Sequence, residues 1–255
     1  MSDSHKTSRL LSDGVMYRRV LKFFPVSFPL GDTRRLVLNS KPDVNSATDV
    51  FLNPFYWRIF DQLKFAPAFV LDCGANCGHF TILMDICIRQ KFGAPKTEYA
   101  LVEGNPLLAD IVRKNLENAE VSGRAVLHEG LAGKRTGTAS FELNTTWTLG
   151  SAVGEKGVTI PYVDLDRIIA GRRMDVLKID IEGSEWDLFE NYPTIFDDVC
   201  YLMLELHPRE GKDYRATIDG FVAKGFRVIE PTDDNHGCMV ALMVHDANIA
   251  KRLKA

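Results

Sequence analysis

The chain has 255 residues, of which 45% are hydrophobic and 25% are charged, a balance that fits one large globular α/β domain. Its formal net charge of −3 argues against nucleic-acid binding as the main function. No apolar stretch approaches the roughly 20 residues of a membrane-spanning helix, and the N-terminus shows no secretory signal, so we expect a cytoplasmic protein.

The five cysteines, at positions 73, 77, 87, 200 and 238, form no C-x-x-C pair. An odd number of cysteines in a chain without a signal peptide predicts reduced thiols rather than a disulfide framework. Cys73 and Cys77 could share a metal ion, but their place in a tight turn favours the interpretation that they are small buried residues.

The first 65 residues predict an appendage to a larger domain, which we assign to residues 66–255. Asn53 followed by Pro54 is typical of a helix N-cap and of the first helical turn. No motif that carries chemistry occurs in this part of the chain. The elements expected here are a helix within residues 8–24, a strand at 34–40 and a helix at 54–63.

From residue 68 the pattern alternates between apolar strands and amphipathic helices. Such alternation predicts a mostly parallel sheet with helices on both faces, in which ligands bind beyond the carboxyl ends of the strands. Two segments of alternating character, 137–143 and 157–163, interrupt this pattern and form an expected excursion from the main sheet. The expected strands are 68–73, 97–103, 124–130, 174–181, 199–206, 227–230 and 238–244, and the expected helices are 78–90, 106–119, 184–192 and 217–226.

The turn after the first of these strands is built for close contact with a ligand. Its sequence, "DCGANCG", places glycines at 74 and 78 after Asp72, in the spacing G-x-x-x-G. A dinucleotide turn would read G-x-G-x-x-G, but Asn76 stands where the middle glycine would be. The ligand predicted for this turn therefore has no pyrophosphate.

A second acid completes the pattern expected of a nucleoside ligand. Glu103 ends the next strand, 25 residues after Gly78, where an acid accepts hydrogen bonds from ribose hydroxyls. Asp72 beside the turn suits a cationic group. A ligand with a ribose, a cationic head and no phosphate is S-adenosylmethionine (SAM). The alternative interpretation is that Asp72 only caps the turn and that Glu103 is a solvated strand end.

Four segments resemble the FkbM-type SAM-dependent methyltransferases: "FVLDCGANCGHFTIL", "YALVEGNP", "DVLKIDIEGSEWDLFE" and "YLMLELHP". The most specific is "KIDIEGSE", and the resemblance covers residues 68–208. It implies a Rossmann-like class I methyltransferase sheet. It also implies that the first turn embraces the methionine portion of SAM, that Glu103 holds the ribose, and that residues 130 and 131 neighbour the adenine. The cofactor-binding residues expected from it are Asp72, Gly74, Ala75, Asn76, Gly78, Glu103, Gly104, Asn105, Gly130 and Leu131.

The ends of the two later central strands carry the candidate catalytic residues. Asp180 and Glu182 lie two residues apart and share a face if the strand continues, as do Glu205 and His207 on the next strand. We expect His207 to act as general base, with Asp180 orienting it or the acceptor, and Glu182 to belong to the same site. The alternative is that these four side chains bind a divalent metal ion.

We therefore expect an O-methyltransferase that acts on a hydroxyl of a small molecule, sugar or glycan. The appendage of residues 1–65 could cap the acceptor site, and residues 144–157 could project over it. Ser184 is expected to cap the helix at 184–192, and Glu185 could be a solvated acid at its start. Two alternatives remain, namely an enzyme that binds NAD or a nucleotide sugar, and a catalytically inactive methyltransferase-like protein.

Overall fold

The computed structural model describes residues 25–31, 33–141, 157–233 and 237–254. The helix expected within residues 8–24 and nearly all of the loop expected at 144–157 lie outside the described residues. The first half of the chain forms β1 (Val26–Pro29), β2 (Arg35–Leu38), α2 (Lys41–Phe51), α3 (Pro54–Gln62), β3 (Phe69–Cys73), α4 (His79–Phe92), β4 (Glu98–Glu103), α5 (Ala109–Asn118), a 3₁₀ turn (Ser122–Arg124) and β5 (Ala125–Glu129). The second half forms β6 (Thr138–Phe141), β7 (Val158–Pro161), α6 (Leu165–Ile169), β8 (Val176–Ile179), α7 (Glu185–Asn191), β9 (Tyr201–Leu206), α8 (Tyr214–Ala223), β10 (Arg227–Asp233), β11 (Met239–Val244) and α9 (Asp246–Leu253).

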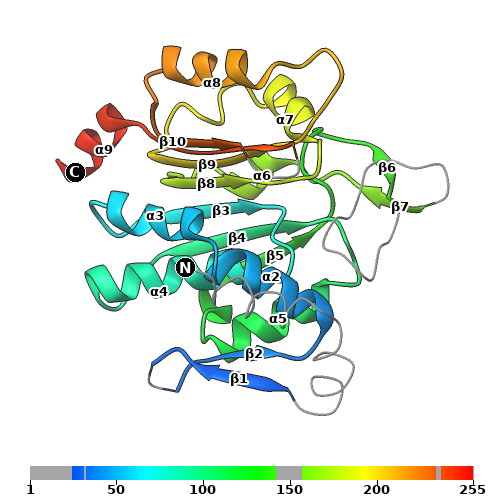
Figure 1. Ribbon diagram of the computed structural model, residues 1–255, viewed down its shortest axis with the longest axis vertical. Helices are drawn as coiled ribbons and strands as arrows, with labels where there is room; N and C mark the ends of the chain where they lie inside the picture. The colour runs from blue at the N-terminus through cyan, green and yellow to red at the C-terminus, as the bar shows by residue number, and fades with distance from the viewer. Residues whose placement is uncertain (1–24, 32, 142–156, 234–236, 255) are drawn as a thin grey trace, which may run out of the picture.

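A seven-stranded sheet in the order β10-β11-β9-β8-β3-β4-β5 forms the centre of the fold (Figure 1). The strands from β9 to β5 pair in parallel, whereas β11 runs antiparallel to both of its neighbours. Each residue of β8 is buried, as expected for a central parallel strand with both faces covered. This sheet confirms the mostly parallel, Rossmann-like architecture predicted from the sequence.

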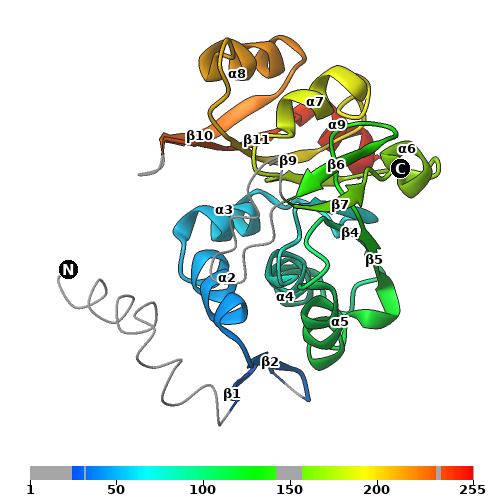
Figure 2. The ribbon, with the colours of Figure 1, turned by 90° about the vertical axis from the view of Figure 1, so that its right-hand side faces the viewer.

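Helices cover the sheet on both sides (Figure 2). Each side has its own apolar core. On one face, Leu165 of α6, Leu188 of α7 and Phe221 of α8 pack against the inward side chains of the sheet. On the other face, the core includes residues of α2 to α5 and also Ile249 of α9. Because the parallel strands share one direction, their carboxyl ends meet at one edge, where the candidate site residues gather.

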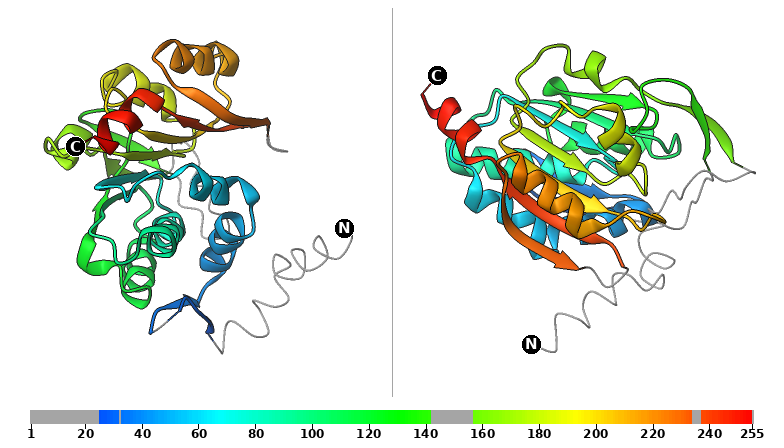
Figure 3. Two further views of the ribbon diagram at one scale, coloured as in Figure 1. Left: turned by 90° about the vertical axis from the view of Figure 1, so that its left-hand side faces the viewer. Right: turned by 90° about the horizontal axis from the view of Figure 1, so that it is seen from above.

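The segment before the sheet is more structured than the sequence predicted. A hairpin of β1 and β2 lies at the end of the molecule opposite α8 (Figure 3). Neither β1 nor α2 was expected from the sequence, and prolines flank or end β1. In α2, Pro42 occupies the first turn, where it is tolerated, and Ser40 caps the helix by accepting a hydrogen bond from Asp43 N.

The segment before residue 66 also shares its core with the sheet. Val50 of α2, and Ile59 and Leu63 from α3 and its end, are buried in the same cluster as Val70 of β3. The expected helix at 54–63 is confirmed, with Asn53 capping it by accepting a hydrogen bond from Phe55 N. The role of residues 1–65 as an acceptor-site cap stays a prediction.

Two further features complete the fold. The expected excursion is a two-stranded antiparallel ribbon of β6 and β7, separate from the main sheet. Within the described parts of the chain, no helix has the length and apolarity needed to span a bilayer.

Candidate active site

The turn between β3 and α4, residues Gly74–Gly78, is called the cofactor loop below. A Cβ atom on Gly74 would lie 1.7 Å from the carbonyl oxygen of Asp180, so no other residue fits there without moving the backbone. Gly74, Asn76 and Gly78 have φ angles of 80°, 52° and 81°, in the left-handed region. Asn76 is not glycine, and its conformation has to be held by its surroundings.

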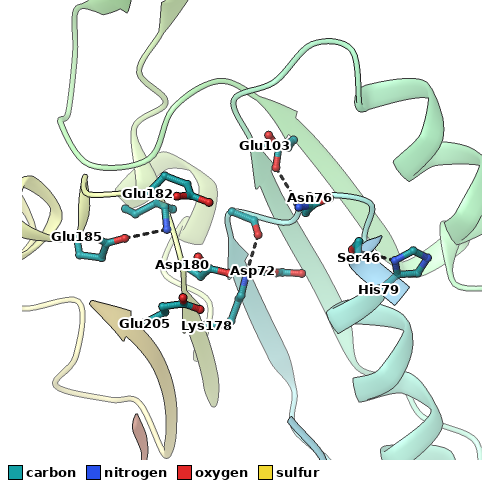
Figure 4. A network of polar contacts seen from close by, with 12 residues as sticks. Ser46, Asp72, Asn76, His79, Glu103, Lys178, Asp180, Glu182, Glu185 and Glu205 are labelled. Carbon is teal, nitrogen blue, oxygen red and sulfur yellow. Dashed lines mark hydrogen bonds and ion pairs between the residues drawn. The ribbon is translucent and has the colours of Figure 1, made fainter. Parts of the chain in front are cut away.

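Lys178 of β8 holds the start of the cofactor loop (Figure 4). Its Nζ donates a hydrogen bond to the carbonyl oxygen of Gly74 at 2.6 Å, and it lies 3.2 Å from Asp180 Oδ2 and 3.6 Å from Asp72 Oδ1. Burial alone would lower the pKa of Lys178, but the charges of Asp180 and Asp72 outweigh it and raise that pKa above its usual range. The buried ammonium therefore ties β3, β8 and the loop together.

Asp72 lies beneath the cofactor loop rather than at the surface of the site. It is fully buried, and its Oδ2 accepts a hydrogen bond from Thr81 Oγ1 at 2.9 Å. Burial raises the pKa of Asp72, while Lys178 counteracts that shift. Ala75 and Gly78, two other residues predicted to bind the cofactor, lie outside the cavity lining as Asp72 does.

Glu103 connects the cofactor loop to the turn after β4. Its Oε2 accepts a hydrogen bond from Asn76 N and its Oε1 accepts one from Asn105 N, both at 2.7 Å. Burial raises the pKa of Glu103 to about 7, although these two backbone N–H groups act in the opposite direction. The expected helix start at Pro106 was wrong: Asn105 Oδ1 caps a turn by accepting from Leu107 N, and α5 begins at Ala109.

A cavity of about 370 Å³ opens at this edge of the sheet, within the size range of small-molecule sites. It brings together most of the side chains and turns that the sequence singled out. Glu129, by contrast, ends β5 in an exposed position and pairs with Arg113. The predicted residues that line the cavity are Gly74, Asn76, Glu103, Gly104, Asn105, Gly130, Leu131, Asp180, Glu182 and His207.

The wall opposite Glu103 carries a histidine held between carboxylates. His207 Nδ1 lies 3.0 Å from Glu185 Oε1, and His207 Nε2 lies 3.3 Å from Glu182 Oε2 and 3.9 Å from Glu205 Oε1. Glu185, rather than Asp180, therefore orients the ring, while Asp180 pairs with Lys178. The indole of Trp186 also donates a hydrogen bond to the carbonyl oxygen of His207.

The charge states on this wall follow from burial and from the neighbouring acids. Burial would lower the pKa of His207, but the hydrogen bond to Glu185 and the nearby charges raise it to about 9. Burial, reinforced by Asp180, raises the pKa of Glu182 to about 7. Glu182 also has a φ of 55°, a left-handed conformation that is unusual for a glutamate and typical of functional sites.

Two important residues were not recognised as such in the sequence. Glu185 is fully buried, not solvated, and its Oε1 also accepts hydrogen bonds from Ile181 N and Gly183 N. These bonds satisfy the turn before α7, and the side chain of Ser184 makes no capping hydrogen bond. Lys178 could have been found, because a lone lysine inside a continuous apolar strand requires a buried partner.

The metal alternative has a partial geometric basis. Ligand atoms of Asp180, Glu182 and His207 lie within 4.8 Å of one another, as do those of Glu205, His207 and Cys238. Lys178, however, already places a positive charge 3.2 Å from Asp180, where it competes with a cation. All five cysteines are buried free thiols.

Comparison with known families identifies the chain's relatives. The model of the methyltransferase FkbM domain matches residues 72–238, a span that runs from the end of β3 to the residue before β11 and contains the whole lining of the cavity. The chain belongs to the FkbM methyltransferase family. It is a SAM-dependent methyltransferase, and the match confirms the resemblance seen in the sequence.

Solved structures with a similar fold are distant in sequence. A protein of the NADB-Rossmann superfamily from Streptococcus agalactiae has 13% identity and a TM-score of 0.45, over 76% of this chain and 68% of that chain. M. capricolum TrmK, in complex with S-adenosyl-homocysteine, has 12% identity and a TM-score of 0.42, over 75% and 68%. A SAM-dependent methyltransferase from Aquifex aeolicus has 11% identity and a TM-score of 0.43, over 78% and 93%. Curated protein sequences gave no match.

The cavity of this FkbM member has the groups that SAM requires. Glu103 lines the cavity with a carboxylate that fits ribose hydroxyls as donors. Gly74 lets the loop pass directly against the backbone of Asp180. The side-chain Oδ1 of Asn76, a residue that lines the cavity, is buried and has no hydrogen-bond partner. When bound, SAM supplies an electrophilic methyl group on a sulfonium ion.

Proposed function

We propose that this methyltransferase transfers the methyl group to a hydroxyl of a small molecule, sugar or glycan. The observation that carries this proposal is the contact between Glu182 and His207 on the wall of the cavity, across from Glu103. A hydroxyl has to lose its proton as it attacks, whereas a neutral amine can attack before it loses one. A proton acceptor built into the acceptor wall therefore favours oxygen as the nucleophile.

The proton acceptor assigned by this proposal is Glu182. Because its pKa is about 7, it is half ionised near neutral pH and is matched to accepting a proton there. His207, with a pKa of about 9, remains an imidazolium at neutral pH and serves as the charged neighbour that stabilises the Glu182 carboxylate. This assignment moves the role of base from His207, where the sequence suggested it, to Glu182.

Positioning supplies the other part of the rate. Glu185 fixes the His207 ring through Nδ1, and Lys178 fixes Asp180 and the cofactor loop, so the two walls of the cavity are held relative to each other. Tyr162, Asp187 and Arg209 also line the cavity. Asp187 and Arg209 pair at 3.1 Å, which leaves the acceptor wall without a strong excess of positive charge for an anionic acceptor.

The test uses SAM with an isotopically labelled methyl group and matched acceptor pairs that differ only by a hydroxyl or an amine at one position. Sugars, glycosides and small alcohols form the hydroxyl set. We expect label transfer to a hydroxyl, located by NMR of the product, and its loss in Glu182→Gln. Transfer to the amine members alone, at a rate that Glu182→Gln leaves unchanged, would contradict the proposal.

A further inference from the structure

A buried polar network connects helix α2 to the end of the cofactor loop. Asn115 of α5 donates through Nδ2 to the carbonyl oxygen of Cys77 at 3.0 Å and to Asp43 Oδ1 at 2.7 Å. Asp43, Cys77 and Asn115 are each at most 2% exposed. Both hydrogens of the Asn115 amide are thus used, one on the loop and one on α2.

A second contact joins the same two parts of the chain one residue after Gly78. His79, the first residue of α4, places Nδ1 2.9 Å from Ser46 Oγ of α2 (Figure 4). Burial lowers the pKa of His79 to about 3, so the ring is neutral and its contact with a hydroxyl needs no counter-charge. The ring also meets Phe51 of α2 edge-on at 6.0 Å between centroids.

Asp43 is itself held from the other side. Its Oδ2 accepts hydrogen bonds from Asn39 N at 3.1 Å and from Ser40 Oγ at 3.0 Å, which fixes the start of α2. The carboxylate therefore leaves Oδ1 aimed at Asn115 with little freedom to move. A group held in this way can position its partner rather than follow it.

We propose that Asp43, Ser46 and Asn115 are positioning residues for SAM binding, which act by holding Cys77 and His79 on either side of Gly78. The proposal rests on the assignment of the cofactor site. Asp43 and Ser46 lie outside residues 72–238, the part matched by the family model, so the segment before the match contributes to the cofactor site.

The backbone of the loop explains why such support is needed. Lys178 holds Gly74 at the start, and Glu103 holds Asn76 in the middle. The left-handed turn at Gly78 is held within the loop by the hydrogen bond from Gly78 N to Ala75 O, and Asn115 adds support from outside the loop by fixing the carbonyl of Cys77. Relaxation there would shift Asn76 away from Glu103, at the place where the ribose is expected to bind.

The experiment compares Asn115→Leu with Asn248→Leu as a matched control. Asn248 of α9 is also buried, and its Nδ2 donates to the carbonyl oxygens of Asp197 and Val199, far along the chain from the loop. Binding of S-adenosylhomocysteine is measured by calorimetry, and amide hydrogen exchange of residues 73–80 is measured in the protein without ligand. We expect Asn115→Leu to weaken binding by about tenfold or more and to speed exchange of the loop.

The control should lower the thermal midpoint by a similar amount while its affinity stays within about twofold of the wild type. If Asn115→Leu fails to fold, the milder variants Asp43→Asn and Ser46→Ala replace it. We expect them to weaken binding and speed loop exchange by smaller factors. The proposal is overturned if the folded variants at Asn115, Asp43 and Ser46 match the wild type in ligand affinity and in amide exchange of the loop. It is also overturned if Asn248→Leu weakens binding as much as they do. Failure of the wild type to bind the ligand would instead overturn the cofactor site, and loop exchange would still test the network.

Discussion

Glu103 accepts backbone hydrogen bonds from two turns and also faces the cavity, so its protonation depends on what the cavity holds. Burial raises the pKa of Glu103 to about 7 in the protein without ligand. Ribose hydroxyls and a cationic ligand both favour the carboxylate, so binding should lower that pKa and release a proton near pH 6 to 7. Affinity should therefore rise from pH 5 to about pH 7 and then level off.

Calorimetry in buffers of different ionisation enthalpy measures this proton release directly. Glu103→Gln should abolish it, and Glu103→Ala should weaken binding by about 1.5–3 kcal/mol, the range for hydrogen bonds to a charged group. Asp110→Ala, which removes an exposed acid of α5 that pairs with Arg113, is the control. Unchanged affinity in a folded Glu103→Ala protein would disprove the ribose assignment.

At Glu182 and His207, the pH dependence of turnover and its response to EDTA separate four mechanisms. With Glu182 as proton acceptor, kcat should rise with pH through about 7, and Glu182→Gln should lower kcat by about 10²–10⁴-fold. His207→Ala should move the rise to higher pH, because Glu182 loses the cation that favours its ionised form. EDTA should leave the rate unchanged.

A rise through about pH 9 in the wild type would instead assign the base to His207, whose pKa lies there. Activity that EDTA abolishes and Mg²⁺ or Mn²⁺ restores would support the metal alternative. In that case Asp180→Asn should reduce kcat as strongly as His207→Ala does. A wild-type rate that is independent of pH between 6 and 10 would leave positioning as the main source of rate enhancement.

Among the elements, the parallel strands were the easiest to predict and α2 was missed. β8 and β9 are apolar runs interrupted by one charged residue each, because both of their faces are covered, and such runs stand out in a sequence. α2 reads as polar because two of its buried residues, Asp43 and Ser46, are polar. Their partners, Asn115 and His79, lie 72 and 33 residues away, so no local pattern could show that these side chains are satisfied.

Contacts between residues distant in the sequence also restricted what could be predicted of the site. The motif residues at the strand ends were predictable because strand order brings them to one edge. What the sequence could not show was which acid touches which base. Glu185 lies at a helix start, where solvated acids are common, yet it is buried because three donors converge on its Oε1. Asp72 was expected at the ligand and is instead covered by the loop that it supports.

Lys178 provides a prediction about how β3 and β8 are held together. Lys178→Met should lower the free energy of unfolding by about 3–5 kcal/mol, because it leaves Asp72 and Asp180 without their buried counter-charge. Lys212→Met is the control, since Lys212 pairs with Glu190 at the surface, where such pairs contribute about 0–1 kcal/mol. Urea unfolding measures both. A loss below about 1 kcal/mol in Lys178→Met would show that the ion triad does not stabilise the fold.

On the scale of the whole molecule, the apolar core includes residues that lie before the start of the family match. The match begins at residue 72, but the core on the α4 side of the sheet includes Val50, Ile59 and Leu63. Arg34, from the turn between β1 and β2, also lies 3.8 Å from the buried carboxylate of Asp85 in α4. The segment before the match is therefore part of the same folded unit as the sheet.

Deletion of residues 1–52 tests whether that segment supports the cofactor site or only caps the acceptor. The deletion removes β1, β2 and α2, and with them the partners of Asn115 and His79. If the segment supports the site, the truncated protein should bind S-adenosylhomocysteine at least about tenfold more weakly and unfold at lower temperature. A deletion that ends at residue 24 leaves every described contact in place and is the control. If the segment is only a cap, the longer deletion should retain full cofactor affinity and lose turnover alone, a result that would contradict the supporting role of α2.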